Sequence, residues 1–349
     1  MLHIVYITTL SKESILSLPS NYCYYIKDLM AKSDVRVSLL NPTVVMKGRK
    51  GILASIKLIR ELNRIGADVV YLNLLMGISD LQIARALGFL NSKIIGWKYT
   101  YCLSFSNPFF NYLTRKFYWK GVDYCFMMFE NHTNDALKKH IIEPEKIETL
   151  TRGCEVEWYR KFTSGEQEKG EFSVIATGKD NRDYETLCKA CEDTKTKLRI
   201  FTRKHSNCVI VAKKYTDSEY VDFVFMEDLN ISTSEEYEYI NHQMSKASVL
   251  AICCEKRPYG VGYSNVVDGL SFGIPILMTT NPDCHIDTEK EGIGYMIQPY
   301  DVESWKKRIL QLKNNKEICN RMSVNIQKLI NFEYNSQTTA NRIYQVMTK

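Results

Sequence analysis

The residues whose types and spacing best suit binding or catalysis lie in Gly262–Leu277, where a glycine turn, a short helix and an apolar strand follow one another. Ser264 or Asn265 is a good N-cap for a helix that runs to Phe272. The N-terminus of such a helix offers unpaired N–H groups and a partial positive charge, both of which favour anions. Asp268 follows in the same helix, where its carboxylate can accept hydrogen bonds from sugar hydroxyls. The segment therefore predicts an anion site beside a sugar site.

A second segment, Phe172–Leu187, has an apolar strand, a turn at Gly178 and an amphipathic helix. The turn carries two cations, Lys179 and Arg182, beyond the carboxyl end of the strand. Open α/β sheets bind ligands at that end of their strands, and a lysine with an arginine beside a helix start suits a diphosphate. Solvated surface cations are the alternative interpretation for such a pair taken alone.

The elements that position these segments alternate between strand and helix along the whole chain. Expected strands of the first half are 2–8, 35–40, 69–74, 93–97 and 123–128. Those of the second half are 173–176, 198–202, 222–225, 249–253, 274–279 and 295–297, followed by helices at 302–314, 316–331 and 336–349. Alternation of this kind implies parallel sheets with right-handed crossovers. The predicted fold class is α/β.

Length and composition agree with a soluble two-domain protein. The chain has 349 residues, of which 45% are hydrophobic and 25% charged, and it is long enough for two cores. A polar junction at 163–170 separates the halves. We expect an N-terminal domain at 1–165, a second domain at 166–335, and a helix at 336–349 that returns to the first domain.

Together the two segments resemble those of glycosyltransferase family 4, whose members have the GT-B fold of two Rossmann-like domains with parallel sheets facing a central cleft. In that family a Gly-Arg turn, and a later Glu-Ala helix ending in Gly-x-Pro, hold the diphosphate and ribose of a sugar nucleotide. Gly178-Lys179 with Arg182 matches the first motif, and Asp268 ahead of Gly273-Ile274-Pro275 matches the second. The resemblance implies a retaining, metal-independent glycosyltransferase that moves a sugar from a nucleotide-sugar donor to a hydroxyl of a glycan or lipid-linked acceptor in cell-surface polysaccharide assembly.

The resemblance also assigns roles to individual residues. It makes the first domain the acceptor-binding domain and the second the nucleotide-sugar-binding domain, with the nucleotide sugar as substrate and no separate cofactor. Lys179 and Arg182 become catalytic, because they would stabilise the departing diphosphate. The implied donor-binding residues are Gly178, Gly262, Tyr263, Ser264, Asn265 and Asp268.

Two departures from the family pattern bear on the mechanism. Many family members have a glutamate eight positions before the second acidic residue, and here that position is Gly260. Glu255 is the nearest substitute and is the third catalytic candidate. The histidine often found after the fourth strand is absent as well, and Lys98 and Tyr99 stand there as acceptor-side candidates.

Three alternative interpretations remain open. A non-catalytic GT-B subunit that binds or activates another transferase is favoured by the missing glutamate and histidine. A sugar-nucleotide epimerase shares the fold but needs acid/base carboxylates and a histidine in the cleft. A phosphorylase-like enzyme needs a lysine context for pyridoxal phosphate that the sequence does not offer.

Cysteine and histidine spacing indicates no metal site. The eleven cysteines are scattered, and Cys188-x-x-Cys191 falls inside a predicted helix, where core packing is the simpler interpretation. The six histidines form no HExxH motif, and no Asp-x-Asp pair occurs. We expect metal-independent chemistry in a reducing cytoplasm.

Charge and aromatic residues suggest contact with an anionic membrane surface. No run of 18 apolar residues occurs, so the sequence predicts no membrane span. The first 165 residues hold 22 Lys and Arg against 14 Asp and Glu, and Phe109–Lys120 combines aromatic with basic residues. We therefore expect peripheral attachment at the inner face of the membrane. No nucleic-acid-binding motif accompanies the basic excess, so nucleic acid is not expected as a partner.

Overall fold

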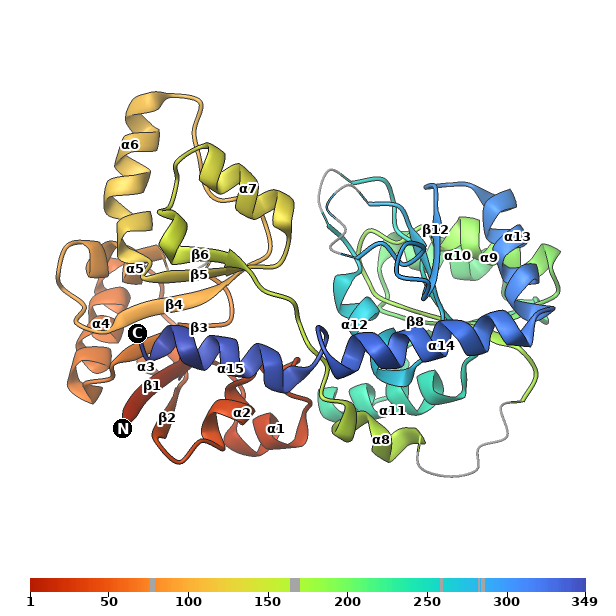
Figure 1. Ribbon diagram of the computed structural model, residues 1–349, viewed down its shortest axis with the longest axis horizontal. Coiled ribbons are helices and arrows are strands. Elements are labelled where there is room, and N and C mark those ends of the chain that lie inside the picture. The colour runs from red at the N-terminus through yellow and green to blue at the C-terminus, as the bar shows by residue number, and fades with distance from the viewer. Residues whose placement is uncertain (76–78, 164–169, 258–259, 282, 284–285) are drawn as a thin grey trace. The chain divides into compact units, whose positions relative to one another are not determined.

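The computed structural model describes residues 1–75, 79–163, 170–257, 260–281, 283 and 286–349. The chain divides into two compact units. Unit 1 comprises Met1–Gly153 and Ser336–Lys349, and unit 2 comprises Cys154–Asn335. Each unit has a six-stranded parallel sheet flanked by helices (Figure 1), as the alternation of strand and helix predicts.

The sheet of unit 1 has the strand order β2-β1-β3-β4-β5-β6. Its strands are β1 (Leu2–Ile7), β2 (Val35–Leu40), β3 (Val69–Leu72), β4 (Lys93–Lys98), β5 (Tyr124–Met127) and β6 (Ile147–Thr149). Its helices are α1 (Lys12–Ser17), α2 (Ile26–Met30), α3 (Pro42–Val45), α4 (Ile52–Ile65), α5 (Ser79–Ala86), α6 (Pro108–Phe117), α7 (Glu130–Lys138) and α15 (Ser336–Met347), with short 3-10 turns η1 (Trp119–Gly121) and η2 (Pro144–Lys146).

Successive residues of β1 point to opposite faces of this sheet. Val5 and Ile7 pack in the same core as Leu58 and Leu62 of α4. Tyr6 points the other way and lies 5.7 Å from the ring of Tyr71. The C-terminal helix α15 crosses the strands of unit 1 (Figure 1), which explains why the tail belongs to this unit.

The sheet of unit 2 has the strand order β12-β11-β10-β7-β8-β9. Its strands are β7 (Ser173–Thr177), β8 (Lys197–Thr202), β9 (Val221–Phe225), β10 (Val249–Ile252), β11 (Ile276–Thr279) and β12 (Gly294–Ile297). Its helices are α8 (Val156–Thr163), α9 (Tyr184–Asp193), α10 (Ser206–Lys214), α11 (Thr233–Lys246), α12 (Tyr263–Phe272), α13 (Val302–Lys313) and α14 (Lys316–Asn331), with a 3-10 turn η3 (Met226–Asp228).

The core of unit 2 explains the closely spaced cysteines of α9. Cys188 and Cys191 are free thiols, fully buried in one cluster with Trp305 and Ile309 of α13. Burial raises the pKa of both thiols, so they are poor nucleophiles. The interpretation of this pair as core packing is confirmed.

The division between the units differs from the boundary expected from composition. The expected junction at residues 165 and 166 lies outside the described residues, and the chain instead passes from unit 1 to unit 2 after Gly153. The reason is α8, whose rings pack on unit 2: Tyr159 and Phe162 lie 5.3 and 6.3 Å from Phe272. The polar stretch at 163–170 comes after α8 in the sequence, but the apolar contacts of α8 decide to which unit it belongs.

Candidate functional site

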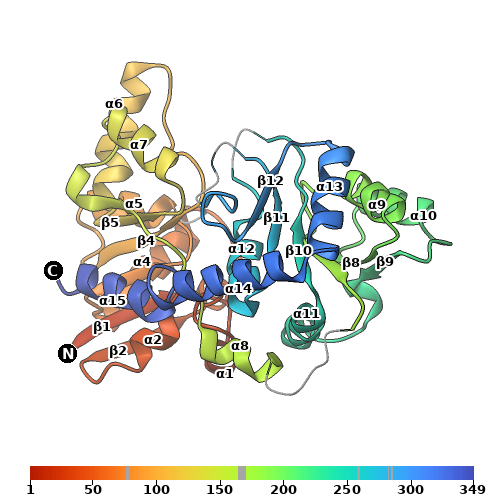
Figure 2. The ribbon, with the colours of Figure 1, turned by 45° about the vertical axis from the view of Figure 1, so that its right-hand side comes forward.

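The two chemistry-bearing segments of the sequence follow neighbouring strands of unit 2. β7 and β10 pair in parallel, and the chain leaves them toward opposite edges of the sheet, to β8 and to β11 (Figure 2). Such a topological switch point opens a crevice at the carboxyl ends of the two strands, and it is where open α/β sheets bind ligands. The loop after β7 holds Gly178–Asp183, and the loop after β10 leads to Gly262.

Gly178 opens the first loop in a conformation that only glycine adopts readily. Its φ is +127°, and a Cβ added there would lie 2.5 Å from the Nε of Arg182. Its carbonyl accepts hydrogen bonds from the hydroxyls of Tyr184 (2.6 Å) and Thr202 (2.9 Å). The glycine therefore lets the backbone turn tightly around the arginine side chain.

Arg182 joins the two segments. Its Nη2 donates to Oδ1 of Asn265 in α12 at 2.7 Å, and its Nε donates to the carbonyl of Thr177 at 3.3 Å. The Asn265 amide in turn donates to the Thr177 hydroxyl. Nη1 lies 3.3 Å from the Asp180 carbonyl. The sequence predicts that Arg182 is a ligand-binding cation. In the structure it also donates to Asn265 and Thr177, and these hydrogen bonds hold α12 against β7.

Lys179 differs from Arg182 in its surroundings. Its side chain is 67% exposed, and its Nζ lies 3.7 Å from the Asp180 carboxylate. An ion pair of that length between exposed groups is weak. Lys179 is therefore the cation of this loop that can turn toward an anion at little cost.

Helix α12 begins earlier than its sequence suggests. Its N-cap is Gly262, in the left-handed region with φ +87°, and not Ser264 or Asn265. The Asn265 side chain is engaged by Arg182, and its N–H donates to the Gly262 carbonyl at 3.0 Å. The prediction that Ser264 or Asn265 caps this helix is therefore wrong. Tyr263, which is buried, and Ser264, which is exposed, form the first turn.

Position 262 requires glycine for two reasons: its backbone conformation is left-handed, and a side chain there has no room. A Cβ at this position would lie 2.5 Å from Cγ2 of Ile252, the last residue of β10. Because Ile252 is fully buried, it cannot move aside. The helix terminus can approach the strand end closely only when residue 262 has no side chain.

Asp268 lies five residues beyond the helix start, about 8 Å along the axis. Its side chain is half-buried, and its Oδ1 lies 3.4 Å from the hydroxyl of Tyr159. That hydroxyl is 2.8 Å from the hydroxyl of Tyr237. Burial, with Tyr159 and Asp268 nearby, raises the pKa of Tyr237 well above its usual value. No local motif marks these two tyrosines, because they come from α8 and α11.

Glu255 lies in the loop after β10. Its backbone N–H donates to the Asn181 carbonyl at 3.0 Å, which ties this loop to the one after β7. Its carboxylate is paired with the Arg257 guanidinium. Glu255, Arg182 and Tyr300 also line a cavity of about 190 Å³. The three catalytic candidates, Lys179, Arg182 and Glu255, thus lie at one edge of the sheet. The negative charge of Glu255 is paired with Arg257.

The two acceptor-side candidates lie at the end of β4 in unit 1, where Lys98 is the last residue of the strand and Tyr99 follows it. Lys98 is only 3% exposed, its Nζ donates to the Thr100 hydroxyl at 3.3 Å, and burial lowers its pKa. Tyr99 stacks on Tyr24 with ring centroids 6.2 Å apart, and their hydroxyls are hydrogen-bonded. Tyr24 has a φ of +53°, an uncommon conformation for a tyrosine. Lys98 is an internal cation and Tyr99 is held at the strand end.

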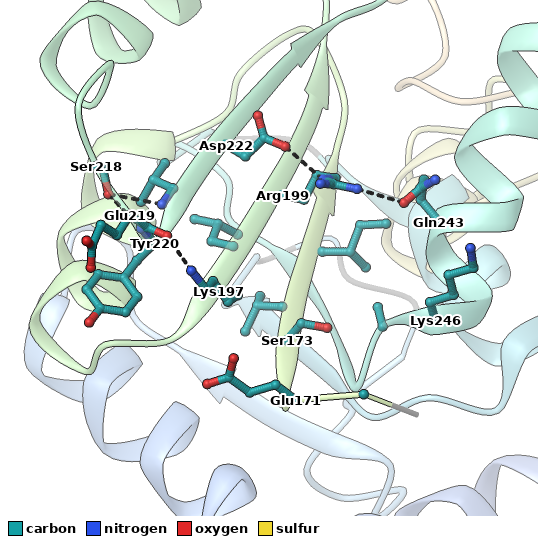
Figure 3. Close-up of a pocket in the computed structure, with 16 residues that line it drawn as sticks. Glu171, Ser173, Lys197, Arg199, Ser218, Glu219, Tyr220, Asp222, Gln243 and Lys246 are labelled. Carbon is teal, nitrogen blue, oxygen red and sulfur yellow. Dashed lines mark hydrogen bonds and ion pairs between the residues drawn. The ribbon is translucent and has the colours of Figure 1, made fainter. Parts of the chain in front are cut away.

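Two further observations bear on alternative sites. Within the described residues, no three or more His, Cys, Asp or Glu side chains are grouped so that they could hold a metal ion. A cavity of about 770 Å³ opens beside the amino-terminal ends of β7, β8 and β9 (Figure 3), away from the two loops. There Arg199 already pairs with Asp222 and Gln243, each at 2.8 Å.

Comparison with known proteins establishes the fold. No protein-family profile and no curated protein sequence matches the chain. Solved structures do: a glycosyltransferase from Rickettsia africae is similar with a TM-score of 0.70 and 12% identity, over 99% of this chain and 97% of that one. HepE of Anabaena, in complex with UDP and glucose, has a TM-score of 0.70 and 11% identity over the full length of both chains.

A third similar structure is WaaG, a glycosyltransferase involved in lipopolysaccharide biosynthesis. Its TM-score is 0.59, with 13% identity over 98% of this chain and 99% of that one. The chain therefore has the GT-B fold of these transferases, with two α/β units and two parallel sheets.

Proposed function

We propose that this protein is a glycosyltransferase of family 4 type, which binds the diphosphate of a nucleotide sugar at the carboxyl edge of the unit 2 sheet. The observation that carries the proposal is the meeting of the Gly178–Asp183 loop and the N-terminus of α12 at the switch point between β7 and β10. The fold supports it, because HepE of Anabaena, which is similar in fold, was solved in complex with UDP. The acceptor is a glycan or lipid-linked glycan in cell-surface polysaccharide assembly.

The proposed chemistry is departure of a nucleoside diphosphate. Negative charge develops on the diphosphate oxygens as the bond to the sugar breaks, so groups that contact those oxygens stabilise the transition state more than the ground state. Lys179 supplies a mobile charge, and Arg182 keeps the α12 terminus in place. An acceptor hydroxyl then attacks the sugar from the face that the diphosphate leaves and gives its proton to the departing diphosphate, so the configuration is retained and no metal is needed.

Asp268 is proposed to accept hydrogen bonds from the donor ribose. Asp268→Asn should therefore raise the Kd for a nucleoside diphosphate about tenfold and leave the Kd for pyrophosphate unchanged. Titration calorimetry with both ligands measures this difference. Tyr159→Phe is the matched control, because it removes the neighbouring hydroxyl and keeps the carboxylate. Equal weakening of both ligands by Asp268→Asn would instead assign the carboxylate to helix support.

A non-catalytic GT-B subunit is the second candidate. It is favoured by Gly260 at the position of the family glutamate and by the pairing of Glu255 with Arg257. The purified chain distinguishes the two candidates when it is incubated with a nucleotide sugar that it binds. Release of the nucleoside diphosphate supports the enzyme, and binding without release supports the subunit.

We also propose that unit 1 attaches to an anionic membrane surface through α6. Phe109, Phe110 and Tyr112 are 63%, 52% and 50% exposed, and Arg115 and Lys116 follow on the same helix. Trp119, by contrast, is buried in η1, so the expected aromatic and basic helix is shorter than residues 109–120. No helix in the described part of the chain could cross a membrane.

A further inference from the structure

A second basic site lies in unit 1, in a cavity of about 560 Å³ beside the C-terminal half of α6. One wall is formed by α6 and η1, and the other by the chain that follows α7. The lining residues that carry the argument are Arg115, Lys116, Trp119, Lys120, His140 and Ile142. Neither the resemblance to transferases nor the proposed donor site accounts for this cavity.

The charge of the cavity is not compensated internally. Arg115 donates to the backbone carbonyl of His140 at 3.3 Å, and Lys116 lies over the ring of Tyr112 at 5.6 Å. Neither these two residues nor Lys120 forms an ion pair with a carboxylate of the described residues. Glu143, the acidic residue of the lining, is paired with Lys146, which lies outside it. Three cations therefore line the cavity without an ion-pair partner among the described residues, and the carboxylate of Glu143 is held by Lys146.

The floor of the cavity is apolar. Trp119 and Ile142 are 2% and 7% exposed, and the Trp119 Nε1 is satisfied by the Leu103 carbonyl at 3.2 Å. Arginine offers a fork of donors that matches phosphate, and lysine adds a mobile charge. A basic rim above an apolar floor suits a phosphate that is attached to an apolar molecule.

The position of the cavity relative to the exposed aromatic residues points to the source of that phosphate. α6 stands out beyond the sheet of unit 1 (Figures 1 and 2), and its first turn carries Phe109 and Phe110. Phe105 packs on Phe110 with centroids 6.0 Å apart, and all three rings are exposed. Arg115 lies six residues further, about 9 Å along the helix axis. A helix at a membrane surface buries its apolar side chains about 5–10 Å deep and keeps its basic residues among the headgroups, so rings in the interface keep Arg115 within reach of the lipid phosphates.

We propose that this cavity binds the phosphate of an anionic membrane lipid. The proposal rests on the membrane attachment of unit 1 proposed above and is independent of the donor site. Arg115, Lys116 and Lys120 hold the phosphate, and the acyl chains continue past the α6 rings. Attachment then depends on the phosphate itself and on where the charges lie, and not only on total charge.

The test uses vesicles in a phosphate-free galactolipid background. One set contains phosphatidylglycerol, and the other contains the same fraction of a sulfolipid with one sulfonate charge. Co-sedimentation of the full chain should be several-fold stronger with the phosphate lipid. Equal binding to both sets would overturn the proposal, because it would show attraction by charge alone. Complete displacement by millimolar glycerol 3-phosphate at constant ionic strength would also overturn it, by assigning the cavity to a soluble phosphate.

Variants test whether the lysines of the cavity are responsible for binding the phosphate lipid. Lys116→Ala/Lys120→Ala should weaken binding to the phosphate lipid about fivefold for each charge removed. Lys307→Ala/Arg321→Ala removes the same charge from exposed positions of unit 2 and should change binding little. Lys120→Ala/Asn134→Lys returns the charge to unit 1 outside the cavity and should not restore binding. Restoration by that variant would sink the cavity assignment.

The donor site is measured in the same variants. Lys116→Ala/Lys120→Ala should bind a nucleoside diphosphate as the wild type does. If the wild type binds no nucleoside diphosphate but still prefers the phosphate lipid, the proposed transferase activity fails while the cavity assignment stands.

Discussion

Arg182→Ala is expected to lower the free energy of unfolding of unit 2 by about 3 kcal/mol and to weaken nucleoside diphosphate binding at the same time. The substitution removes a charge-assisted hydrogen bond to Asn265 and leaves the buried Asn265 amide without that partner. It also releases the N-terminus of α12 from β7. Urea denaturation measures the stability, and calorimetry measures the binding.

Lys179→Ala is the matched control for this prediction. Lys179 is the other cation of the loop, but its side chain is 67% exposed, so its removal should leave the unfolding curve unchanged and weaken diphosphate binding. Arg182→Lys should recover part of the stability, because lysine keeps one donor. An unfolding free energy of Arg182→Ala equal to that of the wild type would show that the contact between Arg182 and α12 contributes nothing to stability.

Gly262→Ala is expected to destabilise unit 2 by at least about 2 kcal/mol and to abolish diphosphate binding. A left-handed conformation costs a non-glycine residue about 1–2 kcal/mol, and the new Cβ would lie 2.5 Å from the buried Ile252 side chain. Relief of that contact must shift the start of α12 away from the strand end. Thermal denaturation and calorimetry of the variant test both effects.

Gly273 at the other end of α12 provides the control. It is also left-handed, with φ +65°, but a Cβ there would meet only the end of the Gln327 side chain, at 3.2 Å. Gly273→Ala should therefore carry the conformational cost and keep the anion site. Unchanged diphosphate binding in Gly262→Ala would show that the anion site does not depend on the N-terminus of α12.

Most of the strands could be predicted from the sequence, because each is an apolar run of parallel-sheet length bounded by turn residues. Val35–Leu40 and the end of α12 at Phe272 agree with the structure, since β-branched residues and Gly273 are strong local signals. The short strand β6 was not predicted, because Ile147–Thr149 is too brief for a periodic pattern. The sequence also predicts a helix at 20–31, and the structure reduces it to Ile26–Met30, preceded by left-handed Tyr24 and Tyr25.

The site was predicted in its parts but not in its contacts. Glycine and charge patterns identified the loops that hold Gly178, Lys179 and Gly262. The bond from Arg182 to Asn265 joins residues 83 positions apart, and Tyr159 meets Asp268 across 109 positions. Local sequence cannot specify such pairs, because they depend on which strands are neighbours in the sheet. The same reason explains the misplaced N-cap: Asn265 is drawn to Arg182 and leaves the cap to Gly262.

The most direct test of the proposed donor site is calorimetric titration of the wild type and of Lys179→Ala with UDP, other nucleoside diphosphates and pyrophosphate. The proposal predicts saturable binding of a nucleoside diphosphate to the wild type, weakened at least about tenfold in Lys179→Ala, with unchanged stability of the ligand-free variant. Lys189→Ala, at an exposed position of α9, should bind as the wild type does. Failure of the wild type to bind any nucleoside diphosphate, or equal affinity in Lys179→Ala, would contradict the assignment of this sheet edge as a nucleotide-sugar site.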